Sequence, residues 1–318
     1  MLLSLSILMR AVAVFCVGLH VAAGAETAAG SSQNLAQREV SKTGVDRSSK
    51  HYRFETHQLA STDGKRRYRI QIGVPRTPAP AEGRAALYML DGNAAIDTLT
   101  DRDLESLSKR SSPVLVAIGY DVTTRNDVVS RAYDYTPPVF QNGLPIAEPF
   151  VLGRLGGGAD IFLQLIENEI KPLVRTRADL GDAEYLWGHS YGGLFAMHVL
   201  FSRPEAFSRY IVGDPSVWWH DGALINEWEA FDALRAAGKQ VAILVGTKPR
   251  PADRPFPYDP VMKNKEGGQI DLREVVREMA DGLREAGADV SYQAFPQYGH
   301  GDMIRISLER ALHIASEP

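Results

Sequence analysis

Ser190 is the residue whose surroundings most clearly suggest chemistry, because it stands in the run GHSYGG of residues 188–193. An apolar stretch that is typical of a buried strand precedes this run, and one typical of a buried helix follows it (residues 183–187 and 194–200). A strand-to-helix turn this tight needs residues without a Cβ around the serine, and it presents the hydroxyl at a helix N-terminus, where negative charge is favoured. The pattern predicts a nucleophilic serine; the simpler alternative is a serine that only caps the helix.

His300 is the residue that we expect to act as general base, since a serine hydroxyl is a weak nucleophile near neutral pH. It lies between two glycines, in the loop between the last apolar stretch that resembles a strand and the final stretch that resembles a helix. In α/β-hydrolases the chain order is nucleophile, acid, histidine, which suits a histidine this late. We expect His189 and His198, close to the serine, to pack inside the protein. The alternative for His300 is an ordinary surface histidine.

The acid that orients the histidine has several candidates in the sequence. It should follow the strand predicted at residues 240–246, and the loop there contains Asp253 and Asp259. We favour Asp253, place Asp259 second, and place Asp214, which follows an earlier predicted strand, third. A serine–histidine pair without a carboxylate also remains open, because the acid mainly orients the imidazole and stabilises its charged form.

An oxyanion hole requires two backbone N–H groups that point at the developing negative charge. Tyr191, the residue after the serine, should supply one of them. The second should come from the loop after the strand predicted at residues 85–90, where Asp91, Gly92 and Asn93 follow, and we expect the amide of Asn93 to serve. A plain turn without catalytic function is the alternative for this loop.

The elements that must position these residues alternate along the chain. Strand-like stretches cover residues 51–60, 67–74, 85–90, 113–120, 184–187, 209–213, 240–246 and 289–295. The first two are joined near Asp63-Gly64, which is a hairpin signal. Helical patterns cover residues 160–175, 194–200, 272–286 and the end of the chain from Met303. Short apolar strands separated by helices predict an α/β-hydrolase fold, with a mostly parallel central sheet and helices on both faces. The candidate residues all follow strand ends, where ligands bind in such sheets.

Residues 1–25 differ in composition from the rest of the chain. Arg10 is followed by an apolar run of about 13 residues from Ala11 to Ala23, and Ala23-Gly24-Ala25 offers a cleavage site. This run is short for a membrane span and typical of a signal peptide, although a retained anchor is the alternative. We expect residues 26–50 to form a flexible segment, and residues 51–318 to form one catalytic domain.

Composition excludes several kinds of protein. With 44% hydrophobic and 23% charged residues, the chain of 318 residues is an ordinary globular one, and its net charge of −4 argues against nucleic-acid binding. Its single cysteine, Cys16, lies in the predicted leader, so the mature chain would have neither disulfides nor cysteine metal ligands. An exported chain without disulfides is compatible with a bacterial periplasm, where we expect this protein.

Four motifs resemble the esterase-D-like "putative esterase" family. They are YMLDGNA at residues 88–94, GHSYGGLF at 188–195, DPSVWW at 214–219 and YGH at 298–300. Within the family they are most similar to bacterial hydrolases of trilactone catecholate siderophores such as enterobactin and salmochelin, over roughly residues 51–315. The resemblance implies that Ser190 is the nucleophile, His300 the base, and Asn93 with Tyr191 the oxyanion donors. The export signal favours the periplasmic branch, in which some members resemble serine–histidine dyads.

A ferric tris-catecholate is a trianion with aromatic rings, so a protein that binds it needs cations and flat apolar side chains near the serine. Of the candidates, we expect Arg131 and Trp218 to contact substrate; the alternative is that loop arginines are solvated and tryptophans belong to the core. The full set of candidates is Arg125, Arg131, Arg154, Lys248, Arg250, Arg254, Trp218 and Trp219.

These observations together predict a serine esterase that hydrolyses the trilactone backbone of an enterobactin-type siderophore. We expect no metal or organic cofactor in the chemistry, with iron present only as part of the substrate. The expected partner is a small siderophore ester, either free or as its ferric complex. We expect no nucleic acid as a partner, and no membrane after signal cleavage. One alternative is a carboxylesterase of the same fold that acts on feruloyl, acetyl or simple esters. An exported siderophore-binding protein without turnover and an acyltransferase are the others.

Overall fold

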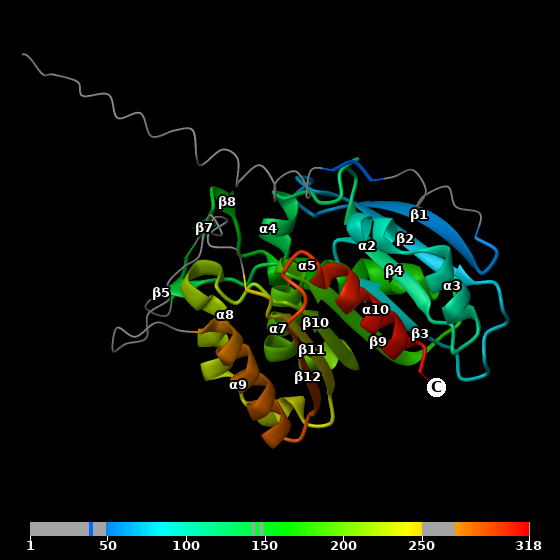
Figure 1. Ribbon diagram of the computed structural model, residues 1–318. Coiled ribbons are helices and arrows are strands. Elements are labelled where there is room, and N and C mark those ends of the chain that lie inside the picture. Colours follow the sequence, from blue (N-terminus) through cyan, green and yellow to red (C-terminus); the bar gives the residue numbers. More distant parts are fainter. Residues whose placement is uncertain (1–37, 41–48, 142–143, 147–148, 250–270, 318) are drawn as a thin grey trace, which may run out of the picture.

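An eight-stranded sheet forms the centre of the molecule in the computed structural model (Figure 1). The structure describes residues 38–40, 49–141, 144–146, 149–249 and 271–317. In spatial order the strands are β1 (Tyr52–Ala60), β2 (Arg67–Pro75), β4 (Val114–Tyr120), β3 (Arg84–Met89), β9 (Leu180–His189), β10 (Arg209–Gly213), β11 (Gln240–Gly246) and β12 (Asp289–Phe295). Pairing is parallel from β4 to β12, and β2 is antiparallel to both of its neighbours.

Helices cover both faces of the sheet, because alternate strand residues point to opposite sides. Leu87 and Met89 of β3 belong to one buried cluster, and Tyr88 between them belongs to the other. The first face packs against α2 (Gly92–Thr98), α3 (Asp101–Ser108) and α10 (Met303–Ala315), which lie on the same side of the sheet in Figure 1. The second packs against α5 (Ala159–Leu165), η2 (Ile166–Ile170), α6 (Lys171–Arg175), α7 (Tyr191–Ser202), α8 (Trp219–Ala230) and α9 (Leu272–Glu285). The α/β-hydrolase fold expected from the sequence is therefore confirmed.

Short elements join β4 to α5. They are α4 (Ser130–Asp134) and the hairpins β5 (Phe140–Gln141) with β6 (Leu144–Pro145) and β7 (Phe150–Val151) with β8 (Arg154–Leu155). The 3-10 turns η3 (Pro204–Ala206) and η4 (Ala233–Ala236) come before β10 and β11, away from the carboxyl ends of these strands. Near its start α8 is interrupted by positive φ angles at His220, Asp221 and Gly222.

Most predicted strands and helices are present, with some differences in their bounds. The hairpin at Asp63-Gly64 forms, with Gly64 at a φ of +68°. The helix expected at residues 160–175 is continuous but contains the π-helical turn η2. The strand before Ser190 begins at Leu180, earlier than expected, and α2, α3, α4 and α8 were not expected from the sequence. Among these, α3 is polar, and it is held at its start by a capping box between Thr100 and Asp103.

The carboxyl ends of three strands converge on the candidate residues. Ser190 follows β9, Asp214 follows β10, and His300 lies in the loop after β12. Within the described part of the chain, every helix is too short or too polar to cross a bilayer. The predicted signal peptide and nearly all of the predicted flexible segment lie outside the described residues.

Candidate active site

Ser190 occupies a strained turn between β9 and α7. Its φ of 60° and ψ of −116° place it outside the regions that side-chain-bearing residues ordinarily adopt. Its N–H donates to the carbonyl of Gly213 at 2.9 Å. A Cβ on Gly188 would lie 2.2 Å from the carbonyl oxygen of Gly192, which explains the glycine at that position. The turn therefore presents the serine hydroxyl at the N-terminus of α7, as the sequence predicts.

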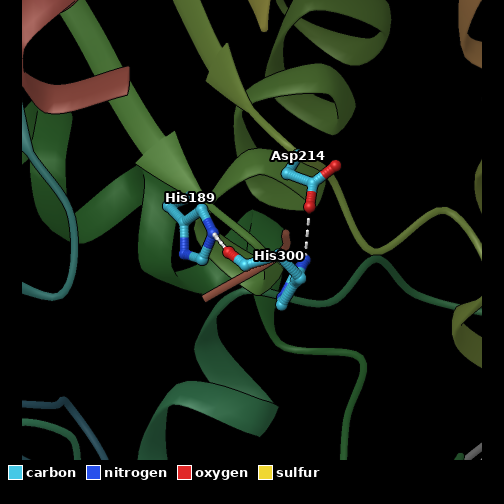
Figure 2. A group of neighbouring side chains, drawn as sticks. All are labelled: His189, Asp214 and His300. Atoms are coloured by element: carbon cyan, nitrogen blue, oxygen red, sulfur yellow. Dashed lines mark hydrogen bonds and ion pairs between the residues drawn. The ribbon is translucent and has the colours of Figure 1, made fainter. Parts of the chain in front are cut away.

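Ser190, His300 and Asp214 form a continuous hydrogen-bonded chain. The Oγ of Ser190 lies 3.1 Å from Nε2 of His300. Nδ1 of the same ring lies 2.6 Å from Oδ2 of Asp214, a contact that Figure 2 shows. The side chain of His300 is 35% exposed and that of Asp214 only 13%. The ring is therefore open to a substrate on one side and held by a buried carboxylate on the other, which is the arrangement of a catalytic triad.

Asp214 fills the position for which the sequence favoured Asp253, and the ranking of the two must be corrected. Its backbone N–H donates to Leu244 at 2.7 Å, and its Oδ1 accepts from the N–H of Gly246 at 3.3 Å. Burial alone would raise the pKa of Asp214, but the hydrogen bond from His300 and the charge of that imidazole hold it below its usual value. Asp253 and Asp259 lie outside the described residues.

The sequence does contain a signal for Asp214, which is its place at the end of a predicted strand. The carboxylate follows a strand predicted at residues 209–213, and that strand proves to be the direct neighbour of β9. The expected chain order, which only requires the acid between serine and histidine, is satisfied by either aspartate. What decides between them is the tertiary contact, since Oδ2 of Asp214 lies 2.6 Å from Nδ1 of His300.

His189 supports the loop that carries the catalytic imidazole. Its Nε2 donates to the carbonyl oxygen of His300 at 2.9 Å, and the two rings lie 4.8 Å apart (Figure 2). Burial, and then the charge of a protonated His300, lower the pKa of His189 to about 3, so this ring stays neutral. His189, Asp214 and His300 have potential metal-ligating atoms within 4.8 Å of one another. Because two of those atoms already bond within the triad, we interpret the group as catalytic.

The two expected oxyanion donors lie on adjoining turns. Tyr191 is the first residue of α7 and Asn93 the second of α2, so both N–H groups belong to helix N-termini. The turns meet closely, since a Cβ on Gly192 would lie 3.3 Å from Cβ of Leu90. The side chain of Asn93 has a separate structural task, because its Nδ2 donates to the carbonyls of Tyr120, Val122 and Thr124. The roles of the two backbone amides stay predictions.

Arg131 lies near the serine, but its guanidinium is engaged by a carboxylate. Its Nε and Nη2 donate to the two oxygens of Asp91, each at 2.7 Å, and the side chains are 13% and 7% exposed. The guanidinium also lies 5.1 Å from the ring centroid of Tyr191. Burial alone would lower the pKa of Arg131, but Asp91 raises it, so the pair stays charged. Arg131 therefore ties Asp91, the residue before α2, to the neighbourhood of Tyr191, the residue after the nucleophile. Contact of Arg131 with substrate stays a prediction.

Trp218, the tryptophan that we expect to contact substrate, lies beside Tyr191 at the edge of the site. Its half-buried ring is 5.8 Å from that of Tyr191, whereas Trp219 is 2% exposed and belongs to the core. Arg125, another candidate cation, forms an ion pair with Asp97. Arg250 and Arg254 lie outside the described residues. Contact of Trp218 with substrate stays a prediction.

Comparison with known proteins agrees with this geometry. The family model described as Putative esterase matches residues 61–253. The apo-salmochelin esterase of Escherichia coli O6:H1 is 34% identical over 269 residues, covering 84% of this chain and 80% of that protein. The ferri-bacillibactin esterase BesA of Bacillus subtilis is 28% identical over 272 residues, covering 83% and 90%.

Among solved structures, that of the enterobactin hydrolase IroE in complex with DFP superposes with a TM-score of 0.72 at 33% identity. The match covers 87% of this chain and 100% of that chain. The resemblance inferred from the four sequence motifs is thereby confirmed. The chain belongs to the putative esterase family, and it is a carboxylic ester hydrolase of the α/β-hydrolase fold.

Proposed function

We propose that this esterase opens the trilactone backbone of an enterobactin-type catecholate siderophore. Ser190 attacks one ester carbonyl, and His300 accepts the serine proton and passes it to the departing seryl hydroxyl. The amides of Asn93 and Tyr191 stabilise the negative charge on the tetrahedral intermediate. Water, activated by the same imidazole, then releases the acyl group from Ser190.

Ester hydrolysis by this protein is supported mainly by the hydrogen-bonded triad of Ser190, His300 and Asp214. The serine–histidine contact is 3.1 Å and the histidine–aspartate contact is 2.6 Å. Nδ1 of His300 faces an ionised carboxylate and so carries the proton, which leaves Nε2 free to accept one from the serine. The carboxylate also stabilises the imidazolium that forms during attack.

The choice of substrate is supported by the relatives. The names of the similar proteins specify salmochelin, bacillibactin and enterobactin, three siderophore substrates. In this chain, the half-buried indole of Trp218 beside Tyr191 offers an aromatic surface next to the nucleophile for a catechol ring. Because Arg131 and Arg125 are paired with carboxylates, neutralisation of a ferric trianion would rely on other cations.

The test is chromatography of the products formed from ferric and iron-free enterobactin, with the wild type and Ser190→Ala. We expect linear trimer, dimer and monomer of dihydroxybenzoylserine from the wild type and none from the variant. A preference of several orders of magnitude for feruloyl, acetyl or para-nitrophenyl esters would instead identify a general carboxylesterase. Tight binding of enterobactin without turnover, and without fluorophosphonate labelling of Ser190, would identify a binding protein.

We also propose that the protein is exported to a periplasm. The proposal rests on the apolar run from Ala11 to Ala23 after Arg10, and on the small residues that end it. N-terminal sequencing of the protein recovered from the periplasm of a Gram-negative host should give a chain that begins at Glu26. An unprocessed chain that remains with the membrane fraction would contradict this.

A further inference from the structure

Ser216 places a second hydroxyl against the nucleophile. Its Oγ lies 3.2 Å from Oγ of Ser190, and its N–H donates to the carbonyl of Ser190 at 3.1 Å. Ser216 is 1% exposed and follows Asp214 by way of Pro215, so the end of β10 delivers both the acid and this hydroxyl. Ser216 lies within the DPSVWW motif, but its residue type and place in the chain do not by themselves predict a contact with Ser190.

The direction of the hydroxyl contact follows from counting hydrogens. Each hydroxyl has one hydrogen to donate. Because Asp214 accepts from Nδ1 of His300, the free lone pair of that ring is on Nε2, and Ser190 must use its single hydrogen there. The contact between the two serines can then be made only if Ser216 donates and Ser190 accepts.

We propose that Ser216 is a further catalytic residue, whose hydroxyl stabilises the Ser190 oxygen as that oxygen leaves the acyl-enzyme. In this step a water molecule gives a proton to Nε2 of His300, and its oxygen bonds to the acyl carbon. The bond from that carbon to Oγ of Ser190 then breaks, and its electron pair stays on Oγ. The proton on Nε2 moves to Oγ, while Ser216 keeps its own hydrogen throughout. This inference depends on the proposed ester hydrolysis through Ser190.

The effect should be greater on deacylation than on acylation. In the free enzyme Ser190 is an alcohol that already accepts the hydrogen bond, so its attack on substrate gains little more from Ser216. In the acyl-enzyme the same oxygen is the alkoxy oxygen of an ester, whose lone pair is delocalised into the carbonyl and accepts poorly. The hydrogen bond from Ser216 becomes strong again only as negative charge develops on the departing Ser190 oxygen. Because this interaction is stronger in the transition state than in the acyl-enzyme, it accelerates deacylation.

The test measures the two steps separately with para-nitrophenyl butyrate as the probe. Stopped-flow release of nitrophenol gives the acylation rate, and mass spectrometry of the decaying butyryl-enzyme gives the deacylation rate. For Ser216→Ala we expect deacylation to slow about tenfold, the size expected for one neutral hydrogen bond, and acylation to change less than about threefold. Because acyl-enzyme then accumulates, kcat and KM should fall together.

Two further variants make the result specific. Ser216→Cys retains only a weak donor, and its deacylation rate should lie between those of the wild type and Ser216→Ala. Ser307→Ala is the matched control, because Ser307 is 0% exposed and its hydroxyl accepts from Trp187 instead of contacting Ser190. We expect Ser307→Ala to keep the wild-type ratio of the two rates.

Equal loss in both steps of Ser216→Ala, or wild-type rates for both, would overturn the proposal. The Ser216→Cys rates decide the question if the alanine variant does not fold. A wild type that neither reacts at Ser190 with fluorophosphonate nor hydrolyses any ester would instead contradict the proposed function. The two failures are therefore distinguishable.

Discussion

Oδ2 of Asp214 lies 2.6 Å from Nδ1 of His300, although the two residues are 86 positions apart in the chain. The contact turns a serine–histidine pair into a triad whose acid extends β10, the strand beside the nucleophile strand. The segment after β11, where the sequence favoured an acid, need not supply one.

Replacement of Asp214 by asparagine should reduce kcat on enterobactin and on para-nitrophenyl butyrate by about 10²–10⁴-fold, because the amide favours the wrong imidazole tautomer. KM should change little, since the carboxylate lies behind the ring, 13% exposed. The matched control is Asp253→Asn, for which we expect kcat to change less than about twofold, because the triad already has its acid in Asp214. The reverse ranking of these variants would return the acid to the segment after β11.

Replacement of Arg131 by lysine tests whether the buried ion pair positions the oxyanion turn. Lysine keeps the charge but cannot bond both oxygens of Asp91 in a planar fork. Because a small displacement of donors is costly in catalysis, we expect kcat to fall about 10–100-fold. The exposed pair of Arg277 with Asp281 provides the control, since Arg277→Lys should leave kcat unchanged.

If Arg131 contacted substrate instead, Arg131→Lys would raise KM more than it lowers kcat. Asp91→Asn provides a second check, since Asp91 and Arg131 act as one unit. The double variant should then lose little more activity than either single variant. Additive losses would contradict a shared positioning role.

Replacement of Gly188 by alanine should destabilise the fold, because the new Cβ would lie 2.2 Å from a backbone oxygen and 2.3 Å from a backbone carbon of Gly192. Backbone atoms there are fixed by the turn, so we expect a loss of about 3 kcal/mol or more in the free energy of unfolding, measured in urea. Gly301→Ala is the control: its Cβ would meet nothing within 4 Å. An unchanged urea midpoint for Gly188→Ala would show that the elbow tolerates a side chain.

His198 should make stability depend on pH. Its ring is 2% exposed and lies between Glu227 at 3.0 Å and Asp160 at 3.1 Å. Burial alone would lower the pKa of His198, but the Glu227 charge and the hydrogen bonds that the ring donates to both carboxylates raise it to about 9 from 6.5. A raised folded-state pKa gives stability that is complete below 6.5 and lost as pH rises through 9.

The measurement is urea unfolding of the wild type and His198→Gln at several pH values. The wild type should exceed the variant by up to about 3 kcal/mol near pH 6, and this difference should shrink toward about pH 10. A difference that stays constant across that range would mean that the pKa of His198 is the same in the folded and unfolded chains.

The fold could be predicted from the sequence because apolar strands, helical periodicity and the glycines around Ser190 are local signals. The sequence missed α3, whose polar surface hides the periodicity, and whose start depends on the capping contact between Thr100 and Asp103. It placed Ser190 and His300 through a motif and a chain order. The ion-pair and hydrogen-bond partners of the other site residues depend on tertiary structure. Asp91 lies 40 positions from Arg131, for example, and no pattern along the chain links the two. The choice among three aspartates likewise required the tertiary contact between Asp214 and His300.

Ser190 and Asp214 extend neighbouring parallel strands, and the bond from Ser190 to Gly213 ties the two strand ends together. The distance between nucleophile and acid is thus set by the pairing of two strands in the sheet and not by the conformation of a loop. Insertions, deletions and exchanges in the surrounding loops can alter which ester is accepted while the proton-transfer geometry persists, so substrate range can evolve in this scaffold without renewed selection for catalysis itself.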